Sequence, residues 1–151
     1  MSKSNHLKDY FLSHRLVTNE LIEKIEKEHY DYKPTSTSMP TKKLVVHMLT
    51  SFYQFASAAA KQAPETLHDP NSETDLSELA QLYTEETVKL IDSLSDEQLD
   101  DMIDLTAILG MELPAETILN LAIDHEINHK GNLFVYVRGM GHTDLPMFVK
   151  K

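Results

Sequence analysis

Apolar residues recur every three or four positions in four segments of the chain, which is the spacing of one face of an α-helix. These segments predict helices over about residues 3–28, 40–62, 75–94 and 114–138. The apolar stripe of the first segment consists of Leu7, Phe11, His14, Val17, Leu21 and Ile25. The proline-containing stretches 30–40 and 64–70 cannot continue a helix and predict loops.

Residues with known capping roles mark several helix boundaries. Asp75, followed three residues later by Glu78, has the form of an N-terminal capping pair, and Pro40 and Pro114 suit the first turn of a helix. The sequence Gly-Met-Gly at 139–141 suits a C-terminal stop.

The remaining stretch, residues 100–113, has a weaker periodicity around a central glycine and predicts an irregular link or a small hairpin. Four amphipathic helices bury their apolar faces most simply against one another. The sequence therefore predicts an all-α fold, a four-helix bundle that forms one domain over residues 1–151. The long connection after the second helix indicates a crossover rather than a plain up-down order.

The composition, with 41% hydrophobic and 25% charged residues, is that of an ordinary globular protein. No apolar run approaches the roughly 20 residues that a membrane-spanning helix needs, and the first residues lack the apolar stretch of a secretory signal. Cysteine is absent, which excludes disulfides, thiolate metal ligands and a catalytic thiol. We therefore expect a cytoplasmic protein that does not bind membranes.

The net charge of −10 arises from 24 acidic and 14 basic side chains. A surface with this charge repels phosphate backbones, and no basic stripe with interleaved aromatic residues offsets it. Nucleic acid is therefore not an expected partner.

Four of the eight histidines fall on faces that the periodicity predicts to be buried, namely His14, His47, His125 and His129. His125 and His129 lie four residues apart on the last helix, so their side chains are one turn apart on the same face. That face reads Leu121, His125, His129 and Leu133. On the second helix, His47 lies between Leu44 and Met48 of the apolar stripe.

Two interpretations of these histidines stay open on spacing alone. A single histidine on an apolar face is more often a hydrogen-bonded core residue, and an isolated His-x-x-x-His is a weak metal signal. Three neutral imidazoles facing one another, however, would leave donors and acceptors to satisfy in a low-dielectric interior. A divalent cation held by three ring nitrogens satisfies them and leaves positions open for water or substrate.

Residues 125–129 also read His-Glu-x-x-His, the zinc-protease signature in which the glutamate is the general base. A protease of this kind needs a further ligand, for which His142 and Asp144 are the downstream candidates, and usually a substrate-binding sheet edge. We therefore do not expect protease activity. Glu126 lies about 100° from His125 around the helix, so it need not point at the metal. It is a candidate base for a bound water or a residue that orients a ligand, and solvation at the surface is the simpler role that we expect.

Other polar residues have expected roles around or away from this site. Asp124 and Asn128 are candidates to fix a histidine proton by hydrogen bonding. His14 falls on a core-facing stripe and is expected to be a satisfied core histidine, with an approach to the site as the alternative. The histidines at helix ends or in loops are expected to carry no site; they are His6, His29, His68 and His142.

The sequence resembles the DinB-like family of metal-binding four-helix proteins, also called DinB/YfiT-like metalloenzymes. The matching pieces are Tyr-Asp-Tyr-Lys-Pro at 30–34, Lys-Leu-Val-Val-His-Met-Leu at 43–49, Asp-His-Glu-Ile-Asn-His-Lys-Gly-Asn-Leu at 124–133 and Val-Tyr-Val-Arg-Gly at 135–139. They extend over nearly the whole chain, and the His…His-x-x-x-His-x-Gly block is the most specific. One departure is Asn132, where many members have glutamine; we expect this difference to affect the surroundings of the metal ligands at most.

The resemblance implies an up-down-down-up bundle and a site for Zn²⁺, Ni²⁺ or a similar ion, with His47, His125 and His129 as ligands. It also implies a homodimer. Related families include transferases that use low-molecular-weight thiols such as bacillithiol or mycothiol, and a mycothiol-dependent isomerase. Many other members have no assigned activity.

From this resemblance we expect a metal-dependent transferase that joins a small thiol to an electrophile, the metal lowering the pKa of the thiol. One alternative is metal-assisted hydrolysis with Glu126 or another carboxylate as base. Another is a non-catalytic metal-binding or stress-related dimeric protein. The third alternative is a metal with a purely structural role, although structural zinc sites usually have four protein ligands.

Overall fold

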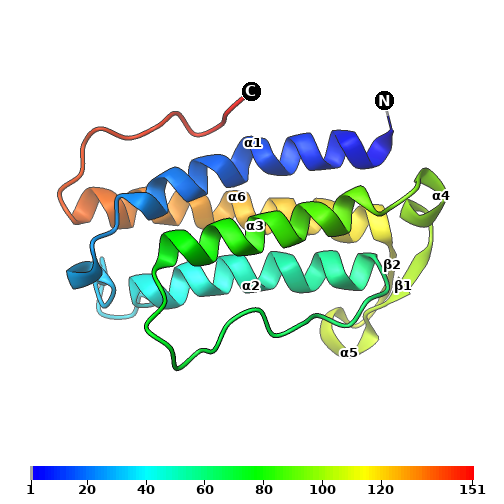
Figure 1. Cartoon of the computed structure of the whole chain (residues 1–151), viewed down its shortest axis with the longest axis horizontal. Helices are drawn as coiled ribbons and strands as arrows, with labels where there is room; N and C mark the ends of the chain where they lie inside the picture. Colours follow the sequence, from blue (N-terminus) through cyan, green and yellow to red (C-terminus); the bar gives the residue numbers. More distant parts are fainter. Residues whose placement is uncertain (1) are drawn as a thin grey trace.

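Four long helices make up most of the computed structural model, which describes residues 2–151 (Figure 1). They are α1 (Lys3–Glu23), α2 (Thr41–Ala59), α3 (Leu76–Asp92) and α6 (Ala115–Gly139). Both α1 and α2 pack against α3 and against α6, so the four helices share a core. In Figure 1, α2 and α3 run in one direction and α1 and α6 in the opposite one. The predicted, mainly helical fold is confirmed.

Short elements occupy the connections between these helices. The 3-10 turn η1 (Lys27–His29) follows α1, and α4 (Asp96–Leu99) follows α3. The link before α6 contains β1 (Met102–Asp104), α5 (Thr106–Leu109) and β2 (Glu112–Pro114). The two strands pair antiparallel with Ile103 opposite Leu113. The link is therefore a small hairpin, one of the two forms that the sequence predicts, and it adds a two-stranded sheet to the fold.

The helix starts agree with the predictions better than the helix ends. The Asp75 carboxylate accepts hydrogen bonds from the backbone N–H groups of Ser77 and Glu78, as a capping residue does. The first two predicted helices are too long, because α1 ends at Glu23 and α2 at Ala59. Apolar spacing did not mark these ends, since Ile25 is buried although it lies beyond α1. No helix between residues 2 and 151 is both long and apolar enough to cross a bilayer.

The buried face of α1 contains the predicted apolar stripe from Leu7 to Leu21 and also polar residues that the pattern does not predict. Arg15 and Thr18 are both completely buried. On α6 the prediction is wrong at Leu121, which is 44% exposed, because the buried stripe runs instead through Ile118 and Ala122. The face that carries His125 and His129 therefore lies at the edge of the core rather than inside it.

The Tyr-Asp-Tyr-Lys-Pro loop is fastened to the ends of two long helices. The hydroxyl oxygen of Tyr30 accepts a hydrogen bond from the N–H of Leu76, at the start of α3. The hydroxyl of Tyr32 lies against Gly139, where an added Cβ would come within 1.9 Å of it. This close approach requires a glycine at the end of α6.

Candidate metal centre

Three imidazole rings meet where α2 packs against α6. His47 projects from α2, and His125 and His129 project from successive turns of α6. The Nε2 atom of His125 lies 3.1 Å from Nε2 of His47 and 3.1 Å from Nε2 of His129. One nitrogen of each ring lies within 4.8 Å of the others. The structure thus brings together the three histidines that the spacing singles out.

The arrangement of the rings fits a divalent ion. The ring planes of the three pairs cross at 74°, 81° and 84°, so the rings do not stack and their Nε2 edges face one another. Metal–nitrogen bonds of about 2.0–2.1 Å place two ligand nitrogens about 3.0–3.4 Å apart at ordinary coordination angles. The two separations of 3.1 Å lie within this range.

Hydrogen bonds to the outer nitrogens orient two of the rings. Nδ1 of His47 lies 3.2 Å from the hydroxyl of Ser51, and Nδ1 of His129 lies 3.1 Å from the side-chain oxygen of Asn132. An amide oxygen accepts but does not donate, so Nδ1 of His129 carries the proton and Nε2 carries a lone pair. Such outer partners fix the tautomer and the orientation of histidines that bind metals.

Of these two partners, Asn132 was expected from the family resemblance to affect the surroundings of the ligands at most, whereas Ser51 was not predicted and the residues predicted to fix a histidine proton are different ones. Asp124 and Asn128 are exposed on α6, and no hydrogen bond joins either of them to the three histidines in the part of the chain that the structure describes. The signal that could have found the true partners is helical spacing. Ser51 follows its histidine by four residues and Asn132 follows its own by three, so each pair shares a helix face.

The site favours neutral imidazoles. Burial lowers the pKa of His47, and the neighbouring His129 lowers it further. Burial also lowers the pKa of His125, with further lowering by His129 and His47. Because a metal ion competes with protons for ring nitrogens, a lowered pKa leaves these ligands available at neutral pH.

Glu126 does not take part in this site, and the expectation that it is solvated is wrong. The side chain is only 1% exposed and points toward α1. Its carboxylate accepts hydrogen bonds of 2.9 and 2.8 Å from Arg15 and one of 2.7 Å from Thr18. Burial opposes ionisation of this carboxyl group, but the Arg15 charge and the hydrogen bonds outweigh it and hold the pKa of Glu126 below its usual range. Both oxygens are therefore engaged in the core.

His14 is a hydrogen-bonded core residue, as expected, and does not approach the three histidines. Its Nδ1 lies 2.7 Å from the ammonium of Lys130, which also donates to the backbone carbonyl of Phe148 in the C-terminal tail. The ring of Tyr10 packs edge-on against it, with centroids 5.1 Å apart. Burial and the Lys130 charge lower the pKa of His14, which favours the neutral ring. Nδ1 of the neutral ring accepts a hydrogen bond from the Lys130 ammonium.

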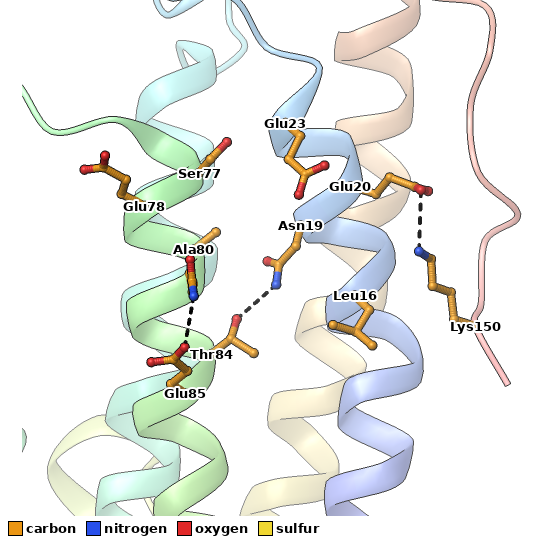
Figure 2. A pocket seen from close by; sticks show the side chains of 11 residues that line it. Leu16, Asn19, Glu20, Glu23, Ser77, Glu78, Ala80, Thr84, Glu85 and Lys150 are labelled. Atoms are coloured by element: carbon orange, nitrogen blue, oxygen red, sulfur yellow. Dashed lines mark hydrogen bonds and ion pairs between the residues drawn. The ribbon is translucent and has the colours of Figure 1, made fainter.

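A groove of about 520 Å³ runs between α1 and α3, on the side of the molecule shown in Figure 2. Its walls carry carboxylates from both helices, namely Glu20, Glu23, Glu78 and Glu85. Asn19 donates a hydrogen bond of 3.2 Å to Thr84 across it, and Lys150 lies 3.5 Å from Glu20. None of the three clustered histidines lines this groove, so it is separate from the candidate metal centre.

The chain is similar to known proteins over its whole length. A family model described as the DinB family matches residues 1–150. An uncharacterized protein of Bacillus subtilis strain 168, YjoA, is 51% identical over 153 residues, which cover 100% of this chain and 99% of the relative. The crystal structure of the DinB-like YjoA protein superposes with a TM-score of 0.86 at 50% identity, covering 97% of this chain and 99% of that one.

A more distant structure has the same fold. A DinB-like protein from Bacillus cereus ATCC 10987 superposes with a TM-score of 0.73, covering 89% of this chain and 90% of that one. Its sequence is 19% identical, so this likeness concerns the fold alone.

Proposed function

The chain belongs to the DinB family, and we propose that it is a metal-dependent enzyme that transfers a small thiol of the bacillithiol type to an electrophile. His47, His125 and His129 would hold one divalent ion, Zn²⁺ or Ni²⁺. The observation that carries this proposal is the convergence of the three rings, with Nε2 of His125 lying 3.1 Å from Nε2 of each of the other two. Ser51 and Asn132 hold the outer nitrogens of His47 and His129.

The donor set supports a reactive rather than a structural ion. Three protein ligands leave at least one coordination position open, whereas structural zinc sites usually have four protein ligands. The three histidines are partly exposed and not enclosed in the core. A bound divalent ion would lower the pKa of a thiol in that position and supply a thiolate at neutral pH.

Thiol transfer suits these residues better than hydrolysis. Hydrolysis calls for a carboxylate base near the bound water, and Glu126 is instead held by Arg15 and Thr18. The chain has no cysteine, so the thiol comes from outside. In the proposed reaction the S–H proton passes to solvent at the open site, sulfur bonds to the electrophilic carbon, and the leaving group departs with its bonding electrons.

Metal binding is tested first, by equilibrium dialysis of chelator-treated protein against Zn²⁺ and Ni²⁺. We expect one equivalent of metal to be lost in His47→Ala and in His129→Ala, and kept in His6→Ala, which removes an exposed histidine of α1. Wild-type protein that binds neither ion would refute the whole proposal.

Thiol transfer is tested next, with a chromogenic electrophile and bacillithiol, glutathione or coenzyme A. We expect turnover that requires the metal and disappears in His125→Ala. Metal binding without turnover for any thiol would support the metal site but refute the transferase activity.

The resemblance also leads us to propose that the protein is a homodimer. Sedimentation equilibrium measures the oligomeric state directly.

A further inference from the structure

A second group of metal-ligating side chains surrounds the turn that follows α1. Glu26, Glu28 and His29 each place one ligand atom within 4.8 Å of the others. Glu26 has an extended backbone, and its carbonyl accepts a 2.8 Å hydrogen bond from the N–H of His29, which closes the η1 turn. The turn thus holds two carboxylates and an imidazole on a short stretch of chain.

A fourth group approaches from the other end of the sequence. Gly141 has a positive φ of 107°, and the N–H of His142 donates to the carbonyl of Val137, so the chain folds back at the end of α6. This turn brings Nε2 of His142 to 3.7 Å from the Glu26 carboxylate, which is too long for a hydrogen bond.

Both histidines at this place have an unsatisfied ring nitrogen. Within residues 2–151, Nδ1 of His29 and Nε2 of His142 are buried atoms without a hydrogen-bond partner. Buried polar atoms are normally paired, because an unpaired one loses its hydrogen bonds to water without replacing them. The unpaired ring nitrogens of these two histidines distinguish the cluster from an ordinary group of surface acids, since a cation would bind imidazole nitrogens as well as carboxylates.

We propose that Glu26, Glu28 and His29 form a second divalent-metal site, which His142 closes from the end of α6. Mixed imidazole and carboxylate donors suit Zn²⁺ and neighbouring transition metals, and two carboxylates balance the charge of a dication. The last residue of α6, Gly139, is on the order of 15 Å along the helix axis from His129, so the two sites are separate.

This second ion would join the segment after α1 to the segment after α6. Its effect is on stability and on the position of the C-terminal tail, and it does not depend on the proposed transferase reaction. The Glu26 side chain is 54% exposed, so the ion exchanges with solvent and binds more weakly than an ion at a closed structural site.

The test uses a His47→Ala/His129→Ala background, which lacks the first site. Equilibrium dialysis against Zn²⁺ should give two equivalents for wild type and one for this background. Adding His29→Ala or Glu28→Gln should weaken the remaining site at least tenfold, whereas adding His6→Ala should leave it unchanged. An unchanged affinity after both His29→Ala and Glu28→Gln would overturn the site.

A spectroscopic measurement separates the role of His142 and does not require activity. With Co²⁺ in the same background, the imidazole proton signals of His29 and His142 should both show large paramagnetic shifts. If only the His29 signals shift and His142→Ala binds Co²⁺ normally, the closing role of His142 is wrong. If neither set of signals shifts, the second site itself is wrong.

Discussion

The Arg15 guanidinium on α1 holds the Glu126 carboxylate on α6 through two hydrogen bonds of 2.9 and 2.8 Å, with both side chains buried. The arginine also lies over the ring of Phe11, 4.8 Å from its centroid. Glu126 adjoins His125 in the sequence, so this ion pair fixes the rotation of α6 that presents its histidines to α2. The glutamate of the His-Glu-x-x-His sequence therefore has a structural role here.

Glu126→Gln should destabilise the protein without removing the metal. A buried ion pair that loses one partner leaves the other charge uncompensated, which costs about 3–5 kcal/mol. We expect urea denaturation to show a loss of about 3 kcal/mol in the free energy of unfolding. Glu116→Gln is the matched control, because Glu116 forms a surface pair with Lys3 at 3.6 Å and such pairs contribute about 1 kcal/mol or less.

The outcome that would contradict this role concerns activity. If Glu126→Gln is as stable as wild type and binds metal normally but has lost turnover, Glu126 is a catalytic base after all. A double variant, Arg15→Met/Glu126→Leu, should regain much of the lost stability, because apolar side chains of similar size can replace a buried ion pair.

Ser51→Ala and Asn132→Ala should weaken metal binding at the three-histidine centre by roughly 10- to 100-fold, the usual effect of removing a hydrogen bond to a ligand histidine. The ligands themselves stay in place, so the stoichiometry should be kept. Competition with a chromogenic chelator measures the affinity.

The controls for these variants lie on the same helices. Thr50→Ala removes a hydroxyl that bonds to the carbonyl of Val46 in its own helix, and Asn128→Ala removes an exposed amide. Neither should alter the affinity by more than a factor of about three. Equal losses for Asn132→Ala and Asn128→Ala would show that Asn132 does not orient His129.

Gly139→Ala should destabilise the protein, because the added Cβ would lie 1.9 Å from the Tyr32 hydroxyl and 2.8 Å from its Cζ. Forcing an extra carbon into a packed site costs about 1–3 kcal/mol. We expect the opposite effect on stability for Gly131→Ala, on the same helix. No atom lies within 4 Å of its added Cβ, and replacing a glycine inside a helix stabilises by roughly 0.5–1 kcal/mol. Thermal unfolding of the two variants should therefore shift in opposite directions.

Tyr32→Phe tests the cause of this difference, because it removes the hydroxyl that meets the added carbon. In the Gly139→Ala background it should restore part of the lost stability. If Gly139→Ala is as stable as Gly131→Ala, the close approach of the tyrosine does not constrain the end of α6.

Stability should fall in acid partly through His14. Burial lowers its pKa in the folded state; Lys130 and Lys151 lower it further, and Glu126 acts in the opposite direction. The unfolded chain, with a histidine pKa near 6.5, then binds the proton more readily. The contribution of His14 is present above pH 6.5, decreases as the pH falls through 6.5, and is lost below the folded pKa.

His14→Gln isolates this contribution, because glutamine keeps an acceptor for the Lys130 ammonium and does not titrate. Urea denaturation with a chelator between pH 8 and pH 5 should show a smaller loss of stability in the variant than in wild type. His6→Gln, at an exposed position, should follow the wild-type curve. A difference between wild type and His14→Gln that does not vary with pH would refute the assignment.

The sequence by itself determined where the four long helices begin and which histidines share a helix face. The i, i+4 spacing of His125 and His129 and the Asp75 cap are local properties, since both depend on residues within one or two turns. For the same reason, the position of each residue around its own helix could be predicted, including the angle between His125 and Glu126.

Tertiary structure alone decided how these faces are turned toward one another. Periodicity gives the angle between two residues on one helix, but the rotation of that helix against its neighbours depends on packing between distant segments. Leu121 is exposed, Glu126 is paired with Arg15, and His142 returns to Glu26 because of such contacts. Sequence spacing could place His47, His125 and His129 on helix faces that were expected to be buried. Only the packing of α2 against α6 brings their rings together at one point.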